Sequence, residues 1–162
     1  MGEEKACQNL EISTRESVSM MVEKLISYTP QDLLDLDALM QELSATSCCS
    51  ESQLKSALAD TNVHVFVIRD SGHIVATGTL CIKHMLEFTV ADIESVVVSS
   101  QCRGSGYGRE LMSALIAAAK ALKVHHIQLT SNPKRVAANR LYRELGFERY
   151  DTNCYKMGLA ES

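Results

Sequence analysis

A short glycine-rich segment carries the clearest chemical signal in this sequence of 162 residues. Arg103 is followed by glycines at positions 104, 106 and 108, and apolar residues recur at helical spacing immediately afterwards. Glycine allows the backbone to curl with its N–H groups pointing inward, and the N-terminal end of a helix adds partial positive charge. Residues 103–108 therefore predict a turn at the start of a helix that binds a phosphate group.

Two other phosphate-binding motifs fit this turn poorly. A P-loop has the pattern G-x-x-x-x-G-K-[ST], and Arg109 stands where its second glycine would be. The dinucleotide pattern G-x-G-x-x-G begins at Gly104 and Gly106, but it also needs glycine in place of Arg109, and no acidic residue lies about 20 positions further on. Hydrolysis of ATP or GTP and a Rossmann-type site are both disfavoured.

Two carboxylates precede the turn on a segment rich in β-branched residues. Asp92 and Glu94 lie within residues 92–98, which we expect to form a strand. Strand alternation predicts that both carboxylates share one face with Val96 and Val98. A carboxylate that reaches an amine, directly or through a water, can accept its proton. Glu94 ranks above Asp92 for this role, and the alternative for either residue is a carboxylate that caps a strand end or pairs with a lysine.

The periodicity of the remaining sequence predicts a layered α/β fold. Amphipathic segments indicate helices, and β-branched or alternating runs indicate strands. In chain order we expect a strand at 21–27, helices at 31–43 and 53–59, a hairpin of 63–68 and 74–82, the strand at 92–98, a helix after the turn, a strand at 127–130, a helix at 135–145 and a final strand or hairpin at 147–157. This order favours a mixed sheet covered by helices over a regular doubly wound sheet.

Composition and charge exclude several classes of protein. The net charge of -4 offers no basic surface for nucleic acid. No apolar run approaches the length of a membrane span, and the first residues lack a signal peptide's apolar segment, so we expect a cytoplasmic protein with no membrane partner. The six cysteines form no C-x-x-C pair, and His125 and His126 have no Cys or Asp at ligand spacing, so we expect no metal site.

Three blocks of the sequence together resemble the GCN5-related N-acetyltransferase (GNAT) superfamily. The turn matches the pattern Arg/Gln-x-x-Gly-x-Gly/Ala through Arg103, Gly106 and Gly108. The other blocks are 93–98, before the turn, and 138–142 with 145–147, after it. The resemblance spans about residues 21–158 and implies an α/β fold with a mixed, mostly antiparallel central sheet, helices on both faces and splayed central strands. It also implies that 21–160 form an acetyltransferase domain, preceded by an extension at 1–20.

The resemblance further implies that acetyl-CoA is the co-substrate. In this superfamily the amides of the turn bind the pyrophosphate, and the preceding strand offers main-chain hydrogen bonds to the pantetheine arm. The residues implied in cofactor binding are Val96, Val97, Val98, Arg103, Gly104, Ser105, Gly106, Tyr107, Gly108, Asn139 and Tyr142.

The same resemblance assigns catalytic roles to two residues. Glu94 matches a common general-base position, and Tyr142 matches the tyrosine that protonates the departing CoA thiolate. Many members have Asn seven residues before this tyrosine, where the present sequence has Arg135. Three environments are open for Arg135: contact with a CoA phosphate, contact with an anionic substrate, or plain solvent.

Three functions are compatible with the resemblance. The first is transfer of an acetyl group to a primary amine of a small molecule, which the similarity of residues 130–142 to small-molecule enzymes of the superfamily favours. The second is acetylation of a protein N-terminus or lysine, and the third is a non-catalytic acyl-CoA-binding regulatory module. We also expect a homodimer, formed through the final strands.

Overall fold

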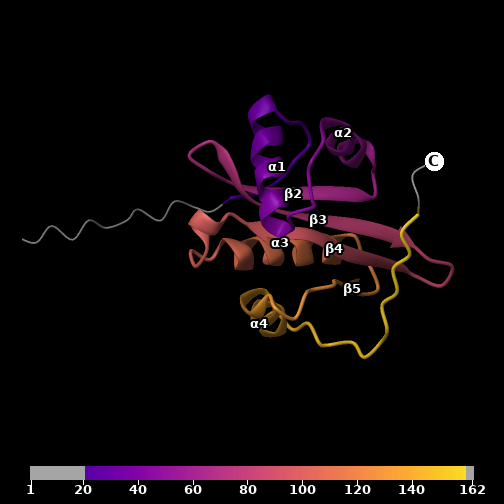
Figure 1. Ribbon diagram of the computed structural model, residues 1–162. Coiled ribbons are helices and arrows are strands. Elements are labelled where there is room, and N and C mark those ends of the chain that lie inside the picture. The colour runs from indigo at the N-terminus through magenta and orange to yellow at the C-terminus, as the bar shows by residue number, and fades with distance from the viewer. Residues whose placement is uncertain (1–20, 160–162) are drawn as a thin grey trace, which may run out of the picture.

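The computed structural model describes residues 21–159, which fold around a five-stranded sheet (Figure 1). The strands lie side by side in chain order as β1 (Val22–Lys24), β2 (Val63–Asp70), β3 (His73–His84), β4 (Thr89–Val98) and β5 (Ile127–Gln128). The first four strands pair antiparallel with their neighbours, and β5 runs parallel to β4. The predicted mixed, mostly antiparallel sheet is confirmed.

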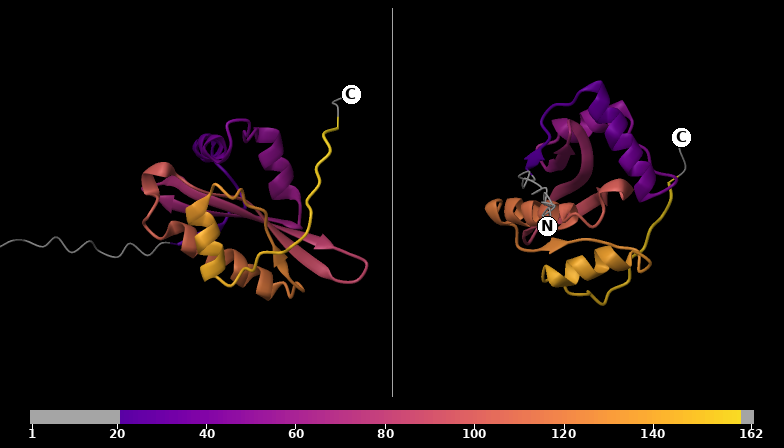
Figure 2. Two further views of the ribbon diagram at one scale, coloured as in Figure 1. Left: turned by 60° about the horizontal axis from the view of Figure 1, so that its bottom comes forward. Right: turned by 90° about the vertical axis from the view of Figure 1, so that its left-hand side faces the viewer.

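Helices cover both faces of this sheet (Figure 2). One face carries α1 (Pro30–Leu43) and α2 (Glu51–Ala59), and the other carries α3 (Tyr107–Ala121) and α4 (Val136–Glu144). A short 3-10 helix, η1 (Ser100–Cys102), connects β4 to the glycine turn. The sheet is therefore the middle layer of a three-layer α/β fold, as predicted.

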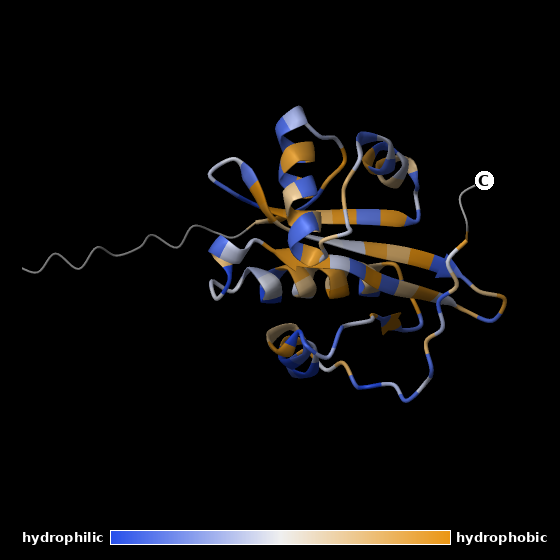
Figure 3. Ribbon diagram, in the orientation of Figure 1, coloured by the Kyte–Doolittle hydropathy of each residue, from blue (hydrophilic) through white to orange (hydrophobic). Residues whose placement is uncertain are grey.

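Each face of the sheet has its own apolar cluster, built from residues of the strands and of the helices that cover that face. Figure 3 shows the hydrophobic parts of these strands and helices in orange. Under α3 the cluster is centred on Ile68, Leu80, Leu111, Met112 and Leu115. Under α1 and α2 it is centred on Leu36, Leu39, Leu54, Val67 and Val97. Burial of these side chains supplies the main force that holds the helices on the sheet.

The predicted start of the first helix is confirmed by its cap. The Thr29 hydroxyl accepts a hydrogen bond from the Asp32 amide (3.2 Å), and the Asp32 carboxylate accepts one from the Thr29 amide (2.9 Å). Pro30 occupies the first helical position, where a missing N–H breaks no helical bond. The buried Asp32 carboxylate also accepts a hydrogen bond from the Arg69 guanidinium on β2, which ties α1 to the sheet.

Replacing Asp32 with asparagine is expected to lower the free energy of unfolding by about 2 kcal/mol at neutral pH. Hydrogen bonding to Arg69 lowers the pKa of Asp32 from 3.8 to about 2. A carboxylate with a depressed folded pKa stabilises the fold above its unfolded pKa, and this contribution is lost as the pH falls through the folded pKa. Urea unfolding curves of wild type and Asp32→Asn should therefore converge between about pH 4 and pH 2. The exposed Asp151→Asn is the control, and a gap that stays constant down to about pH 3 would contradict this role for Asp32.

The expectation that Asp92 and Glu94 share one face with Val96 and Val98 is wrong. A shift in register between β3 and β4 marks a β-bulge in β4 after Glu94. An extra residue in a strand reverses the alternation of side chains beyond it. Ile93 before the bulge and Val96 and Val98 after it contribute to the same cluster, so the two carboxylates point toward the opposite face.

The bulge lies opposite the point where β3 approaches α3 closely. Ser95 within the bulge has a φ of 55°, in the left-handed region that few non-glycine residues adopt. Gly78 of β3 lies opposite the bulge, and a Cβ atom at this position would come within 2.9 Å of the Leu115 side chain of α3. The bulge brings Glu94, Ser95 and Val96 together along the wall of one cavity.

The prediction of a final strand at 147–157 is also wrong. Residues 147–159 have no regular secondary structure, and those from 148 onward are exposed. β5 is an edge strand of the described sheet, and residues 147–157 do not pair with it. The homodimer expected through this segment stays a prediction, as do the domain limits, and the extension at 1–20 lies outside the described residues.

Candidate functional site

The glycine turn lies at the N-terminal end of α3 with its amides free. Gly104 and Gly106 have φ values of 81° and 89°, which glycine adopts without strain, and Gly106 is the N-cap of the helix. The backbone N–H groups of residues 104–108 donate to no backbone acceptor within residues 21–159. An anion at this position would receive several of these N–H groups as well as the positive end of a 15-residue helix.

A cleft of about 760 Å³ opens beside this turn. Val96, Val97 and Val98 of β4 border it, together with Tyr107 and Gly108 of α3. The first residues of α4 form the opposite wall. Most of the residues implied in cofactor binding therefore border a single space.

Two of the implied cofactor residues, Arg103 and Asn139, have other contacts within the fold. The Arg103 guanidinium lines the cleft, but it donates to the Val98 carbonyl (3.2 Å) and pairs with Glu42 (3.1 Å), which holds the turn against β4 and α1. The Asn139 amide donates to the Asn132 carbonyl (2.8 Å) and to the carbonyl of residue 135 (2.9 Å), and so it braces the loop before α4. Neither Ser105 nor Asn139 is among the residues that line the cleft. Their contacts with the cofactor stay predictions.

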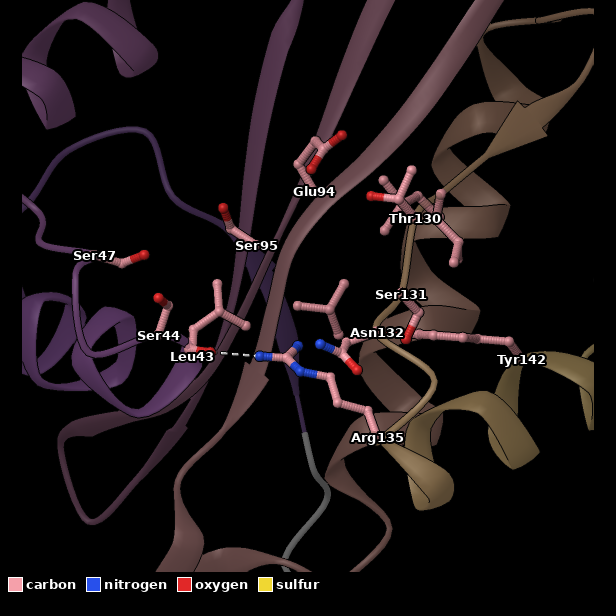
Figure 4. Close-up of a pocket in the computed structure, with 13 residues that line it drawn as sticks. Leu43, Ser44, Ser47, Glu94, Ser95, Thr130, Ser131, Asn132, Arg135 and Tyr142 are labelled. Atoms are coloured by element: carbon pink, nitrogen blue, oxygen red, sulfur yellow. Dashed lines mark hydrogen bonds between the residues drawn. The ribbon is translucent and has the colours of Figure 1, made fainter. Parts of the chain in front are cut away.

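A second cavity, of about 370 Å³, lies where β4 and β5 separate (Figure 4). The two strands pair at only two positions, and the chain beyond them diverges to form two walls, residues 93–96 and 129–132. The C-terminal end of α1 and the side chains of Arg135 and Tyr142 complete the lining. This limited pairing is the splay of central strands that the sequence resemblance implied.

Glu94 lines this second cavity, and its carboxylate forms no salt bridge within residues 21–159. Partial burial, together with the negative charge of Asp92, raises the pKa of Glu94 above its ordinary value of 4.5. Asp92 instead forms an ion pair with Lys83 (2.5 Å) and accepts a hydrogen bond from the Gln128 amide (2.7 Å). The geometry therefore favours Glu94 over Asp92 as a proton acceptor.

Tyr142 lies between the cleft and the second cavity and lines both. Its side chain is 8% exposed and packs edge-to-face with Phe147, with ring centroids 6.1 Å apart. Burial raises the pKa of Tyr142 above its ordinary value of 10.0, and the positive charge of Arg135 opposes this shift. The phenol is therefore protonated at neutral pH and able to donate its proton.

Several hydroxyl groups of the second cavity belong to no recognisable sequence motif. They come from Ser44, Ser47, Ser95, Thr130 and Ser131, on three segments that meet only in the folded chain. The Ser131 hydroxyl is buried and has no hydrogen-bond partner within the described residues. A buried hydroxyl without a partner is destabilising, so a ligand that supplies one would be favoured here.

Other types of site have little support in residues 21–159. This part of the chain contains no cluster of three or more His, Cys, Asp or Glu side chains that could hold a metal ion. His125 stacks on Phe88 with ring centroids 4.8 Å apart. Among the described helices, none has the length and apolar character needed to cross a membrane.

Comparison with known proteins places this site in a family. The model of the acetyltransferase (GNAT) family matches residues 31–147. A putative acetyltransferase from Agrobacterium tumefaciens str. C58 is similar to the chain with a TM-score of 0.74 and 26% identity, over 86% of this chain and 100% of that one.

Two more distant structures share the fold. They are glucosamine-6-phosphate N-acetyltransferase from Arabidopsis thaliana, with a TM-score of 0.70 and 19% identity over 86% of this chain and 98% of that one, and an aminoglycoside acetyltransferase from an uncultured soil metagenomic sample, with a TM-score of 0.72 and 17% identity over 88% and 97%. Because the family model matches well over half of the sequence, the chain belongs to the GNAT family of acetyltransferases, which are acetyl-CoA-dependent acyltransferases.

Proposed function

We propose that the protein transfers the acetyl group of acetyl-CoA to a primary amine of a small molecule. One observation carries this proposal: Glu94 and Tyr142 line the same cavity, and that cavity shares part of its wall with the cleft beside the glycine turn. The residues common to the two spaces are Leu43, Val96, Arg135 and Tyr142. The two spaces are therefore adjacent, which supports a reaction in which a molecule in the cleft extends its thioester toward Glu94 and Tyr142.

The residues around the cleft are suited to acetyl-CoA. The free amides of residues 104–108 match the negative charge of a pyrophosphate. Beyond the point where β4 and β5 separate, Val96 to Val98 of β4 border the cleft, and no strand of the described sheet pairs with this edge in competition with the amides of a pantetheine arm. When bound, acetyl-CoA supplies the acetyl group as a thioester.

Glu94 and Tyr142 would transfer protons on the two sides of the reacting carbonyl. Glu94 accepts the proton that the amine loses as its nitrogen bonds to the acetyl carbon, and its raised pKa strengthens it as a base. Tyr142 donates its phenolic proton to the sulfur as the carbon–sulfur bond breaks, which releases a neutral thiol. The products are an N-acetyl amide and CoA. Glu94 then releases its proton to water and Tyr142 takes one up, which restores both side chains.

The size of the second cavity favours a small acceptor. Its volume of about 370 Å³ lies near the lower end of the range for small-molecule sites. The two distant structural relatives are named for glucosamine-6-phosphate and for aminoglycosides, both of which are small molecules.

Release of free thiol from acetyl-CoA, measured against a panel of small primary amines and short peptides, tests this function. Turnover of at least one small amine is expected. Turnover of peptides alone would favour protein acetylation instead. Binding of acetyl-CoA without turnover of any member of a broad panel would favour a non-catalytic binding module.

Replacing Gly106 with alanine is expected to weaken acetyl-CoA binding by about tenfold or more, because N–H groups that bond a charged phosphate contribute on this scale. At a φ of 89°, an alanine would force the turn to change shape. Gly72, at a φ of 87° in the β2–β3 turn, provides a matched control in which alanine meets a similar strain with open space around it. Calorimetric titration should show weaker binding for Gly106→Ala alone, and an equal loss in Gly72→Ala would show that general destabilisation is the cause.

A further inference from the structure

Arg135 spans the wall between the cleft and the second cavity. It is the N-cap residue of α4, its side chain is half-buried, and it lines both spaces. Its Nη2 atom donates to the Leu43 carbonyl at the end of α1 (2.6 Å). The guanidinium therefore reaches across the mouth of the second cavity from one layer of the fold to another (Figure 4).

The positive charge of Arg135 has no counterpart within residues 21–159. Arg69, Arg103 and Arg109 each form an ion pair with a carboxylate, whereas Arg135 forms none in this part of the chain. A guanidinium has five N–H donors in a planar fork that suits carboxylate and phosphate groups. With one bond to a neutral carbonyl, Arg135 keeps most of this capacity for a bound anion.

The surroundings of Arg135 supply further groups for such an anion. The Ser131 hydroxyl in the same cavity is buried and without a partner among the described residues. The hydroxyls of Ser44 and Ser47 lie on the α1 side of the cavity (Figure 4). Glu94 lies at the opposite end of the cavity from Arg135 (Figure 4). The cavity thus has a negative end and a positive end, with hydroxyl groups between them.

We propose that the acceptor is a compact amine that also carries a carboxylate or phosphate group, and that Arg135 binds this anionic group while the amine lies beside Glu94. The proposal rests on the acetyltransferase function proposed above and names the class of its substrate. The charge pattern of the cavity is complementary to such a molecule, because the ammonium group is attracted to Glu94 and the anion to Arg135. The phosphate groups of acetyl-CoA are the alternative anion for Arg135, because Arg135 also lines the cleft.

Matched pairs of amines with and without an anionic group provide the test. We would use ethanolamine with 2-aminoethyl phosphate, and 1-aminobutane with 4-aminobutanoate. Binding to the CoA-loaded protein is measured by calorimetry, and KM is measured by thiol release. The anionic member of at least one pair is expected to bind about tenfold tighter or more, as expected for hydrogen bonds to a charged group.

Variants of Arg135 separate the two sources of the anion. Arg135→Gln should remove the preference for the anionic amine. It should change the Kd of acetyl-CoA by less than about twofold, because in this proposal Arg135 binds the amine's anionic group and not a CoA phosphate. Arg135→Lys keeps the charge without the fork and should restore part of the preference. Arg143→Gln, an exposed position on the same helix, is the control and should behave as the wild type.

Three results would overturn the proposal. They are equal or weaker binding of the anionic members, absence of binding by every amine of the set, and an Arg135→Gln variant that loses affinity for acetyl-CoA alone. Failure of the acetyltransferase function itself is distinguishable, because the protein would then release no thiol with any amine, neutral or anionic. Turnover of neutral amines without a charge preference overturns only the substrate class.

Discussion

Tyr142→Phe is expected to lower kcat by about 100-fold or more, which is the lower range of general acid–base contributions. Burial keeps the phenol protonated at neutral pH, and its position between the two cavities would place it beside the thiolate that departs. Phenylalanine keeps the ring and its edge-to-face contact with Phe147 but has no proton to donate. Thiol release at saturating acetyl-CoA and amine measures this loss, and the Kd of acetyl-CoA should change by less than about twofold.

Tyr150→Phe is the matched control for this variant, because Tyr150 is 85% exposed and outside both cavities. It should have the kcat of the wild type. If Tyr142→Phe also kept the full kcat, the role of Tyr142 would be packing of its ring in the core beneath α4. A loss shared by both variants would point to a general effect on the fold.

Glu94→Gln is expected to lower kcat/KM at neutral pH by about 100-fold, because the glutamine amide cannot accept the proton of the amine. The wild-type rate should rise with pH as Glu94 loses its proton. Since partial burial and the Asp92 charge raise the pKa of Glu94, this rise should lie at a higher pH than for an ordinary glutamate with a pKa of 4.5. In Glu94→Gln this rise of the rate with pH should disappear. Any rise of the rate that remains at higher pH reflects deprotonation of the amine substrate.

The pH profile also identifies results that contradict this role. Glu148→Gln, at an exposed position beyond α4, is the charge-matched control and should leave the profile unchanged. If Glu94→Gln kept the wild-type profile, Glu94 would not be the base. Asp92 would then be the next residue to test, although its ion pair with Lys83 keeps it occupied in the structure.

Local signals in the sequence were sufficient for most of the secondary structure. Thr29 and Pro30 identify the start of α1 because a cap needs only a few neighbouring residues. The glycines at 104, 106 and 108 identify the turn before α3 because the backbone there must adopt positive φ at Gly104 and Gly106. The order of strands and helices then restricts the fold to a mixed sheet with helices on both faces.

Patterns of alternation failed where the outcome depends on a partner strand. The bulge after Glu94 is defined by the register of β4 against β3 around Gly78, and this register cannot be seen in residues 92–98 themselves. Residues 147–157 include Phe147, Tyr150 and Tyr155, which are residue types that favour strands, but a strand forms only where another backbone supplies its hydrogen bonds. In the described part of the chain, residues 147–157 pair with no strand of the sheet.

The sequence by itself determined the family, the glycine turn at the start of α3 and the two residues that we propose as base and acid, because each of these is encoded by residue types at short spacing or in ordered blocks. Tertiary structure alone decided which groups meet in the cavity. In the folded chain Asp92 forms an ion pair with Lys83 and accepts a hydrogen bond from Gln128. The Ser131 hydroxyl has no hydrogen-bond partner among the described residues. Arg135 donates to the Leu43 carbonyl, 92 positions away in the chain. Such contacts depend on how separate layers pack on the sheet, and no local pattern of residues specifies them.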